Sequence, residues 1–128
     1  MIYLDSSVLL AQILGEDRRP PQSLWQEDLV SSRLLEYEVW VRVYARKLDT
    51  TAEAAARTAL AEVEMYELSQ AVLERALQPF PVGLRTLDAL HLATINHLRR
   101  LDQDVVLASY DHRLLDAAAA LGIERAPL

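Results

Sequence analysis

The chain opens with Met1-Ile-Tyr-Leu-Asp-Ser-Ser-Val-Leu-Leu10, in which four apolar residues precede a carboxylate, two serines and a second apolar run. The short apolar start predicts a β-strand buried on both faces, with Asp5 at its carboxyl end. Ser6 or Ser7 is expected to cap the following helix, because a serine oxygen there accepts a hydrogen bond from a free backbone N–H. Ligands of open α/β sheets bind beyond the carboxyl ends of the strands. Asp5 therefore either serves chemistry at that edge or only ends a strand.

Strands and helices alternate along the rest of the chain. Further strands are predicted at residues 29–31, 65–68 and 105–108, with a short one at 123–126. Helices are predicted at 7–15, from about 22, and at 33–48, 51–63, 69–77, 87–101 and 111–122. Their predicted N-terminal caps are Ser32, Ser69, Thr86 and Asp111, and Gly15 and Gly122 are predicted to end helices. Parallel strands need crossover connections, so this order predicts an α/β fold, a three-layer α/β/α sandwich with a mostly parallel central sheet. We expect residues 1–128 to form a single domain.

Composition excludes several classes of protein. With 52% apolar and 25% charged residues, the chain has the mix of a globular protein, and without cysteine it has no disulfides or thiolate metal sites. It lacks both the basic start of a signal peptide and the apolar run of roughly 18 residues that a membrane span needs. We therefore expect a cytoplasmic protein with no membrane partner. The formal net charge of −6 disfavours binding of nucleic acid by bulk electrostatics, but allows a site where cations and local arginines neutralise phosphate.

Four carboxylates stand at comparable places in the predicted fold. Asp5 ends the first strand, and Glu38 lies within the helix after the second. Asp88 is in the first turn of a helix that follows a proline-containing loop, and Asp111 follows the strand at 105–108. In a doubly wound sheet these side chains can converge on one cleft. Asp88 and Asp111 also have structural explanations, since the helix dipole favours an anion in the first turn and aspartate is a common N-cap.

Glu38 is harder to explain by structure alone, because it lies beside the apolar stripe of its helix. That stripe is predicted to consist of Leu34, Tyr37, Val41, Tyr44 and Leu48. Glu36 is rotated roughly 200° from Glu38 and points away. A carboxylate beside an apolar stripe needs a partner, because its unpaired burial is costly. Arg42, one turn later, and a metal ion are the two candidates.

The available ligands suit a hard cation. Oxygen donors, without cysteine or a histidine pair at metal spacing, favour Mg²⁺ or Mn²⁺ over zinc. His91, one turn after Asp88, is interpreted as a core histidine with one satisfied nitrogen rather than a base, and His97 and His112 as surface residues. With three glycines and no G-x-S-x-G elbow, Walker loop or Gly-rich dinucleotide turn, the chain fits serine hydrolases, P-loop enzymes and dehydrogenases poorly.

Four segments carry a family resemblance. They are Ile2-Tyr-Leu-Asp-Ser-Ser7, Ser32-Arg-Leu-Leu-Glu-Tyr-Glu38, Leu84-Arg-Thr-Leu-Asp-Ala-Leu-His-Leu-Ala93 and Leu107-Ala-Ser-Tyr-Asp-His-Arg-Leu-Leu115. In this order and spacing, over nearly the whole chain, the sequence resembles the small bacterial PIN-domain ribonucleases, the VapC-like toxins of toxin-antitoxin pairs.

The resemblance implies an endoribonuclease that depends on magnesium or manganese. The positions that match the family's four acids are Asp5, Glu38, Asp88 and Asp111, and those that match its supporting hydroxyls are Ser109 before the last acid and Ser6 or Ser7 after the first. Glu36 leaves open which of the two glutamates is used. The family also implies a cognate antitoxin, whose tail blocks the cleft, and a homodimer.

The expected reaction is in-line attack of water on an RNA phosphodiester, with Arg85, Arg113 or Arg42 offsetting charge in the transition state. Two rival readings remain. A haloacid-dehalogenase-like phosphatase also has an aspartate after its first strand, but it needs a second one two residues later, where this chain has Ser7. A non-catalytic binding module with the same fold would keep four acids with no metal to offset their repulsion.

Overall fold

Strands and helices alternate in a computed structural model of the chain, which describes residues 1–15, 17–46, 50–101 and 103–128. The elements are β1 (Ile2–Leu4), α1 (Ser6–Leu14), the 3₁₀ helix η1 (Gln22–Gln26), β2 (Leu29–Ser32), α2 (Leu34–Ala45), α3 (Thr50–Ala61), β3 (Glu64–Tyr66), α4 (Gln70–Leu77), α5 (Thr86–Arg100), β4 (Val106–Ala108) and α6 (His112–Ala120).

The four strands form one parallel sheet in the order β3-β2-β1-β4. Tyr3 of β1 lies opposite Val30 of β2 and Leu107 of β4. The chain therefore runs from β1 outward to β2 and β3, and then returns to the other side of β1 to form β4. Ligands of open α/β sheets bind where the strand order reverses in this way. Asp5, directly after β1, stands at that point.

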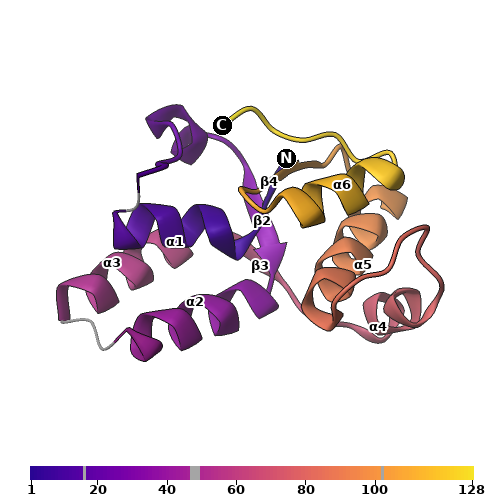
Figure 1. Cartoon of the computed structure of the whole chain (residues 1–128), viewed down its shortest axis with the longest axis horizontal. Helices are drawn as coiled ribbons and strands as arrows, with labels where there is room; N and C mark the ends of the chain where they lie inside the picture. The colour runs from indigo at the N-terminus through magenta and orange to yellow at the C-terminus, as the bar shows by residue number, and fades with distance from the viewer. Residues whose placement is uncertain (16, 47–49, 102) are drawn as a thin grey trace.

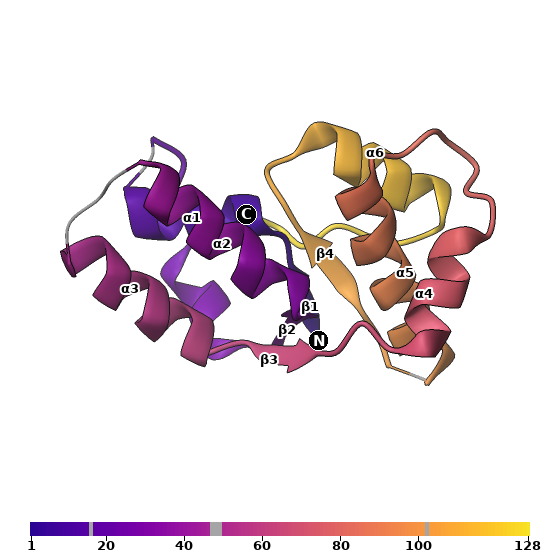
Figure 2. The same ribbon diagram turned by 90° about the horizontal axis from the view of Figure 1, so that it is seen from below.

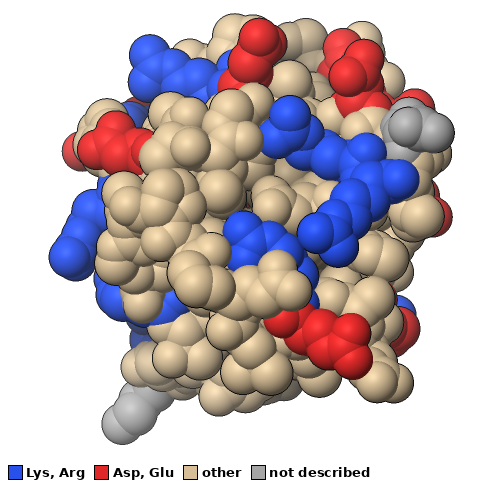
Figure 3. Space-filling view, turned by 90° about the vertical axis from the view of Figure 1, so that its right-hand side faces the viewer, with Lys and Arg blue, Asp and Glu red and all other residues tan. Residues whose placement is uncertain are grey.

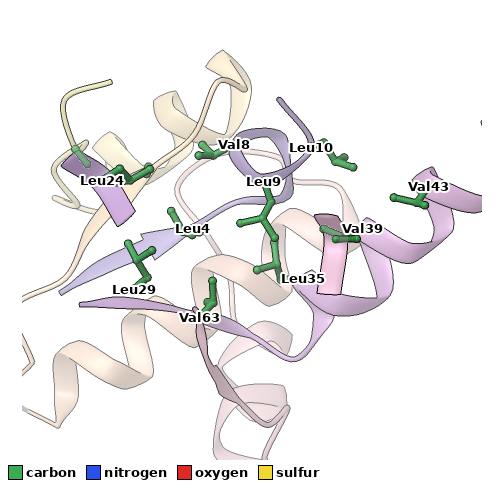
Figure 4. Close-up of a cluster of buried hydrophobic side chains, with 13 residues drawn as sticks. Leu4, Val8, Leu9, Leu10, Leu24, Leu29, Leu35, Val39, Val43 and Val63 are labelled. Carbon is green, nitrogen blue, oxygen red and sulfur yellow. The ribbon is translucent and has the colours of Figure 1, made fainter. Parts of the chain in front are cut away.

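The sheet separates two layers of helices. Figures 1 and 2 show α1, α2 and α3 on one side of the strands and α4, α5 and α6 on the other. Successive residues of a strand point to opposite faces, so Leu4 joins the first hydrophobic cluster and Tyr3 the second. The first cluster, drawn in Figure 4, packs Leu9 of α1 with Leu35 of α2, and the second contains Leu92 of α5. The predicted three-layer α/β/α sandwich is confirmed.

The start of α1 differs from the prediction. Its N-cap is Asp5, whose carboxylate accepts the backbone N–H of Ser7, so the expected cap at Ser6 or Ser7 is wrong. The strand ends one residue earlier than a serine cap requires, and aspartate caps a helix as well as serine does. Gly15 (φ 63°) and Gly122 (φ 72°) take the left-handed conformation expected where a helix stops.

Two of the other predicted caps are present. Ser69 accepts the N–H of Val72, and Asp111 those of Arg113 and Leu114. Ser32 accepts the N–H of Leu34, but the N-cap position of α2 belongs to Arg33. The cap at Thr86 is wrong, because Thr86 is the first residue of α5 and the N-cap position belongs to Arg85. The strand predicted at 123–126 is reduced to an isolated parallel bridge between Leu107 and Arg125.

The buried face of α2 is not the predicted one. Tyr37, Val41 and Tyr44 are 63%, 45% and 59% exposed, and Leu48 lies outside the described residues. Leu34 is buried as predicted, but the residues that enter the core with it are Leu35, Val39 and Val43. Leu35, Val39 and Val43 also recur at steps of four, so both sets have helical spacing. The packing of α1 and α3 against α2 decides between them.

Two further expectations concern the chain as a whole. Among the described residues, no helix is both long and apolar enough to cross a bilayer. The single domain over residues 1–128 stays a prediction.

The corrected face of α2 can be tested with a matched pair of valines. Val39→Ala should lower the free energy of unfolding by about 2 kcal/mol, because it removes buried methyl groups and leaves a cavity. Val41→Ala makes the same chemical change on the exposed face and should stay within about 0.5 kcal/mol of wild type. Any gain in helix propensity is common to both variants and cancels in their difference. Urea denaturation measures both; equal losses would contradict the assigned face.

Candidate active site

A cavity of about 440 Å³ lies at the carboxyl edge of the sheet. Its walls come from the start of α1, the middle of α2, the start of α5 and the segment before α6. All four predicted acids line it, namely Asp5, Glu38, Asp88 and Asp111. The structure therefore brings four carboxylates that are distant in sequence to one place, which we call the acid pocket.

Asp5 is the most buried of the four acids and is only 6% exposed. Its Oδ2 accepts hydrogen bonds from the hydroxyls of Ser7 at 2.7 Å and Ser109 at 2.8 Å, besides the backbone N–H of Ser7 at 3.4 Å. Ser109 Oγ also accepts the N–H of Asp111 at 2.9 Å, so it joins two of the acids. Since these bonds all fall on Oδ2, Oδ1 is the oxygen with which Asp5 can bind a ligand.

The hydrogen-bond partner of Glu38 is His91, which was neither of the two candidates, Arg42 and a metal ion, that the sequence suggested. Glu38 Oε1 lies 2.5 Å from Nε2 of His91, and its Oε2 accepts a longer bond of 3.4 Å from the hydroxyl of Ser6. Arg42 lines the acid pocket but makes no recorded ion pair with Glu38 among the described residues. Glu36 lies outside the acid pocket and pairs with Arg33 at 3.1 Å. Of the two glutamates, only Glu38 is positioned to act with the other acids.

His91 is buried, as predicted for a core histidine, yet both of its ring nitrogens have partners. Nδ1 lies 2.7 Å from the hydroxyl of Tyr3, which also accepts the backbone N–H of Ser32 at 3.1 Å. Because that N–H can only donate, the Tyr3 hydroxyl is free to donate to Nδ1, and Nε2–H then donates to Glu38. Burial strongly raises the pKa of Tyr3, which keeps the phenol protonated as a donor. This chain of bonds fixes the orientation of the Glu38 carboxylate.

Arg85 joins the remaining two acids. Its guanidinium contacts Asp88 Oδ2 through Nε at 3.0 Å and Asp111 Oδ2 through Nη2 at 3.1 Å. The hydrogen bond to Asp88, followed by the charge of Asp88, raises the pKa of Arg85 above its ordinary value. Asp111 is also the N-cap of α6, so the structural explanation of that residue holds. The ion pairs with Arg85 and the capping role of Asp111 leave room for a second role, since both carboxylates still face the acid pocket.

The donors present fit a hard divalent cation. Asp5, Glu38 and His91 each offer a ligand atom within 4.8 Å of the others, a grouping that no other His, Cys, Asp or Glu of the described chain forms. Ligands on opposite sides of a Mg²⁺ ion are about 4.2 Å apart, so Asp5 and Glu38 are nearly placed to share one ion. Both nitrogens of His91 are already hydrogen-bonded, and hard cations prefer oxygen. The carboxylates of Asp5 and Glu38 are therefore the suitable ligands. Asp88 and Asp111 line the same pocket but do not belong to this closest group.

Comparison with known proteins places the chain in a family. Residues 2–120 match the family described as PIN domain. The chain belongs to the PIN-domain family. Its relatives include Ribonuclease VapC46 of Mycobacterium tuberculosis, 37% identical over 95% of this chain and 93% of the relative, and Ribonuclease VapC47 of the same species, 31% identical over 95% and 93%.

Solved structures of similar fold agree. A toxin-antitoxin complex from Klebsiella pneumoniae matches with a TM-score of 0.69 at 21% identity, over 94% of both chains. Mycobacterium tuberculosis VapC20, described as a sarcin-ricin loop cleaving toxin, matches with a TM-score of 0.72 at 20% identity, over 100% of both chains. These likenesses support the PIN fold, and the expected resemblance is confirmed. The match to the PIN family over residues 2–120 replaces the haloacid-dehalogenase alternative.

Sequence reasoning missed two features of this PIN domain. The first is the pairing of His91 with Glu38, which joins residues 53 positions apart and leaves no local signal. The second is Arg18, which lines the acid pocket with Arg42 and Arg85, and whose only signal is the short run Arg18-Arg19. Arg113, by contrast, does not line the acid pocket, and only its backbone N–H contacts Asp111.

The hydrogen-bond chain through Tyr3 generates a stability prediction. Tyr3→Phe keeps the ring but removes the hydroxyl that serves both Ser32 and His91, so two buried groups lose a partner. We expect a loss of about 1–3 kcal/mol in the free energy of unfolding. Tyr66→Phe is the matched control, because the Tyr66 hydroxyl makes no hydrogen bond recorded within the described chain. Denaturant titration of the two variants compares them, and equal stability would show that the buried chain of bonds contributes nothing.

Proposed function

We propose that this PIN domain is a metal-dependent endoribonuclease that hydrolyses RNA phosphodiester bonds, and that it is the toxin of a toxin-antitoxin pair. The observation that carries the proposal is the acid pocket, where Asp5 and Glu38 come within reach of one ion and Asp88 and Asp111 face the same space. The relatives named as VapC ribonucleases, similar over nearly their whole length, point to the same chemistry.

In this proposal Asp5, Glu38, Asp88 and Asp111 hold Mg²⁺ or Mn²⁺, directly or through its water ligands. The bound ion would carry a substrate phosphate and lower the pKa of a water for in-line attack. Ser109 keeps Asp5 and Asp111 in place, and Ser6 and His91 orient Glu38. The guanidinium groups of Arg18, Arg42 and Arg85 line the pocket and offset negative charge as it develops on the phosphate.

The uneven distribution of charge supports RNA as the substrate. Although the net charge is −6, the face formed by α4, α5 and α6 has several basic side chains in its middle, with acidic ones mainly toward its edges (Figure 3). Local positive potential of this kind attracts a phosphate backbone at physiological salt.

The proposal includes a cognate antitoxin and a homodimer. The structural relative from Klebsiella pneumoniae is a toxin-antitoxin complex, which supports a protein partner for this chain. The exposed apolar side chains of α2, Tyr37, Val41 and Tyr44, offer surface for a protein contact. A cytoplasmic location, expected from the sequence, is consistent with an RNA substrate.

One observation favours a second candidate, a non-catalytic binding module. Arg85 pairs with both Asp88 and Asp111 and offsets part of their negative charge, so their mutual repulsion alone does not demand a metal. A module that uses the pocket only to bind a cationic group of a partner would explain the same contacts.

Replacement of Asp5 tests the catalytic role. Asp5→Asn should lower metal-dependent cleavage of RNA by at least about a hundredfold, because it removes a charge that holds the ion. Asparagine can still cap α1 and accept the serine hydroxyls, so the melting temperature should change little. Asp116→Asn, an exposed position on α6 away from the pocket, is the control and should keep full activity. Full activity in Asp5→Asn would refute the assignment.

Binding of Mn²⁺ separates the two candidates without any activity assay. At a free concentration 100 times its Kd, a ligand that binds only the folded state stabilises it by about 2.7 kcal/mol. For a chain of this size, that is a rise of several degrees in Tm. The rise should disappear in Glu38→Gln and persist in Glu36→Gln, since Glu36 lies outside the pocket. If wild type shows no rise, the non-catalytic module is the better description.

A further inference from the structure

A second cavity adjoins the acid pocket. Its volume is about 500 Å³, and its walls include Arg18, Ser109, Tyr110, His112 and Arg125. Arg18 and Tyr110 line both cavities, so they form the boundary between them. We call this second cavity the basic pocket.

The two cavities differ in charge. Four carboxylate side chains line the acid pocket, whereas no Asp or Glu side chain is among the described residues that line the basic pocket, where the negative group is the terminal carboxylate of Leu128. Arg18 and Arg125 supply positive charge there, in a chain whose net charge is negative. A cavity of this charge attracts anions such as phosphate.

The boundary between the cavities is a cation–π contact between an arginine and a tyrosine. The guanidinium carbon of Arg18 lies 4.9 Å from the centroid of the Tyr110 ring. Unpaired RNA bases stack on aromatic rings and on arginine planes of this kind. The backbone of Tyr110 is fixed, because its N–H donates to Ser7 Oγ at 2.9 Å, and Ser7 itself bonds Asp5. The stacking platform is thus anchored directly to the acid pocket.

Arg125 is also held by its backbone. Leu107 of β4 donates its N–H to Glu124 and accepts that of Ala126, both at 2.8 Å, so the residue between them is fixed beside the sheet. The Arg125 side chain is exposed, and no ion pair is recorded for it within the described residues. Its guanidinium is available to a ligand.

We infer that the basic pocket binds one nucleotide of single-stranded RNA next to the phosphodiester in the acid pocket, with its base on the Arg18–Tyr110 pair and its phosphate at Arg125. The volume suits one such unit rather than a duplex, since sites for small molecules span roughly 300–1,000 Å³. This inference rests on the proposed function, because it extends the path of the same substrate.

The test measures RNA binding in the cleavage-deficient Asp5→Asn background. The probe is a fluorescein-labelled oligoadenylate of about 12 nucleotides, long enough to cover both cavities. Adding Arg125→Ala should weaken binding. It should also reduce the magnitude of the negative slope of log K against log salt by about 0.7, the value for one phosphate contact to a single strand. Arg57→Ala removes the same charge from an exposed position of α3, in the other helical layer, that lines neither cavity, and should leave the slope nearly unchanged.

A second pair of variants tests the stacking platform. Tyr110→Leu should weaken binding roughly five- to 150-fold, the range for loss of one stacked base, while Tyr110→Phe should keep the affinity. Circular dichroism melts check that each variant is folded. In the active background, Arg125→Ala should raise KM for RNA with kcat nearly unchanged, because the contact lies away from the reacting phosphate.

The outcomes separate this inference from the proposed function. If wild type cleaves RNA but Arg125→Ala behaves like Arg57→Ala and Tyr110→Leu like Tyr110→Phe, the basic pocket does not bind RNA and the nuclease assignment stands. If the variants weaken binding of the antitoxin and leave RNA binding and KM unchanged, the cavity is a protein contact and the inference is wrong. If wild type neither cleaves nor binds RNA, both proposals fail.

Discussion

The buried carboxylate of Asp5 is the constraint on which the site depends. It ends β1, caps α1 and accepts the hydroxyl of Ser109 from the end of β4, so one side chain ties together three segments at the point where strand order reverses. A charge at this depth is tolerable only because hydrogen bonds compensate the lost hydration. Those bonds all use one oxygen and thereby leave the other for a ligand. Structural need and chemical function are thus divided between the two oxygens of one carboxylate.

Four carboxylates in one cavity repel each other, and the structure offsets this repulsion in two ways. Arg85 bridges Asp88 and Asp111 at the outer side, where its own exposure keeps the interaction weak and exchangeable. Asp5 and Glu38 instead accept hydrogen bonds from serine hydroxyls and from the imidazole of His91. Within the described residues no arginine or lysine pairs with Asp5 or Glu38, so both carboxylates remain available to a divalent cation.

The layer architecture and the approximate location of the acids were predictable, because apolar periodicity and the strand order already place Asp5, Asp88 and Asp111 at one edge. The buried face of α2 was not, since Leu35-Val39-Val43 and Tyr37-Val41-Tyr44 both satisfy helical spacing, and only packing against α1 and α3 selects between them. The partner of Glu38 was missed for a related reason. A hydrogen bond between α2 and α5 depends on how two layers meet, which no local pattern encodes.

That contact also shows how the site is coupled to the whole fold. Tyr3 points into the layer of α5 and α6, Leu4 into the layer of α1 and α2, and the bond from His91 to Glu38 crosses from one layer to the other at the edge of the sheet. Glu38 is therefore oriented only when both helical layers are packed on the same strands. Because Asp5 is fixed by β4 and Glu38 by α5, the two innermost acids each depend on elements from the C-terminal half of the chain. A metal-binding arrangement of the two acids cannot precede the folding of that half, so a partly folded chain lacks the centre on which the proposed toxic activity depends.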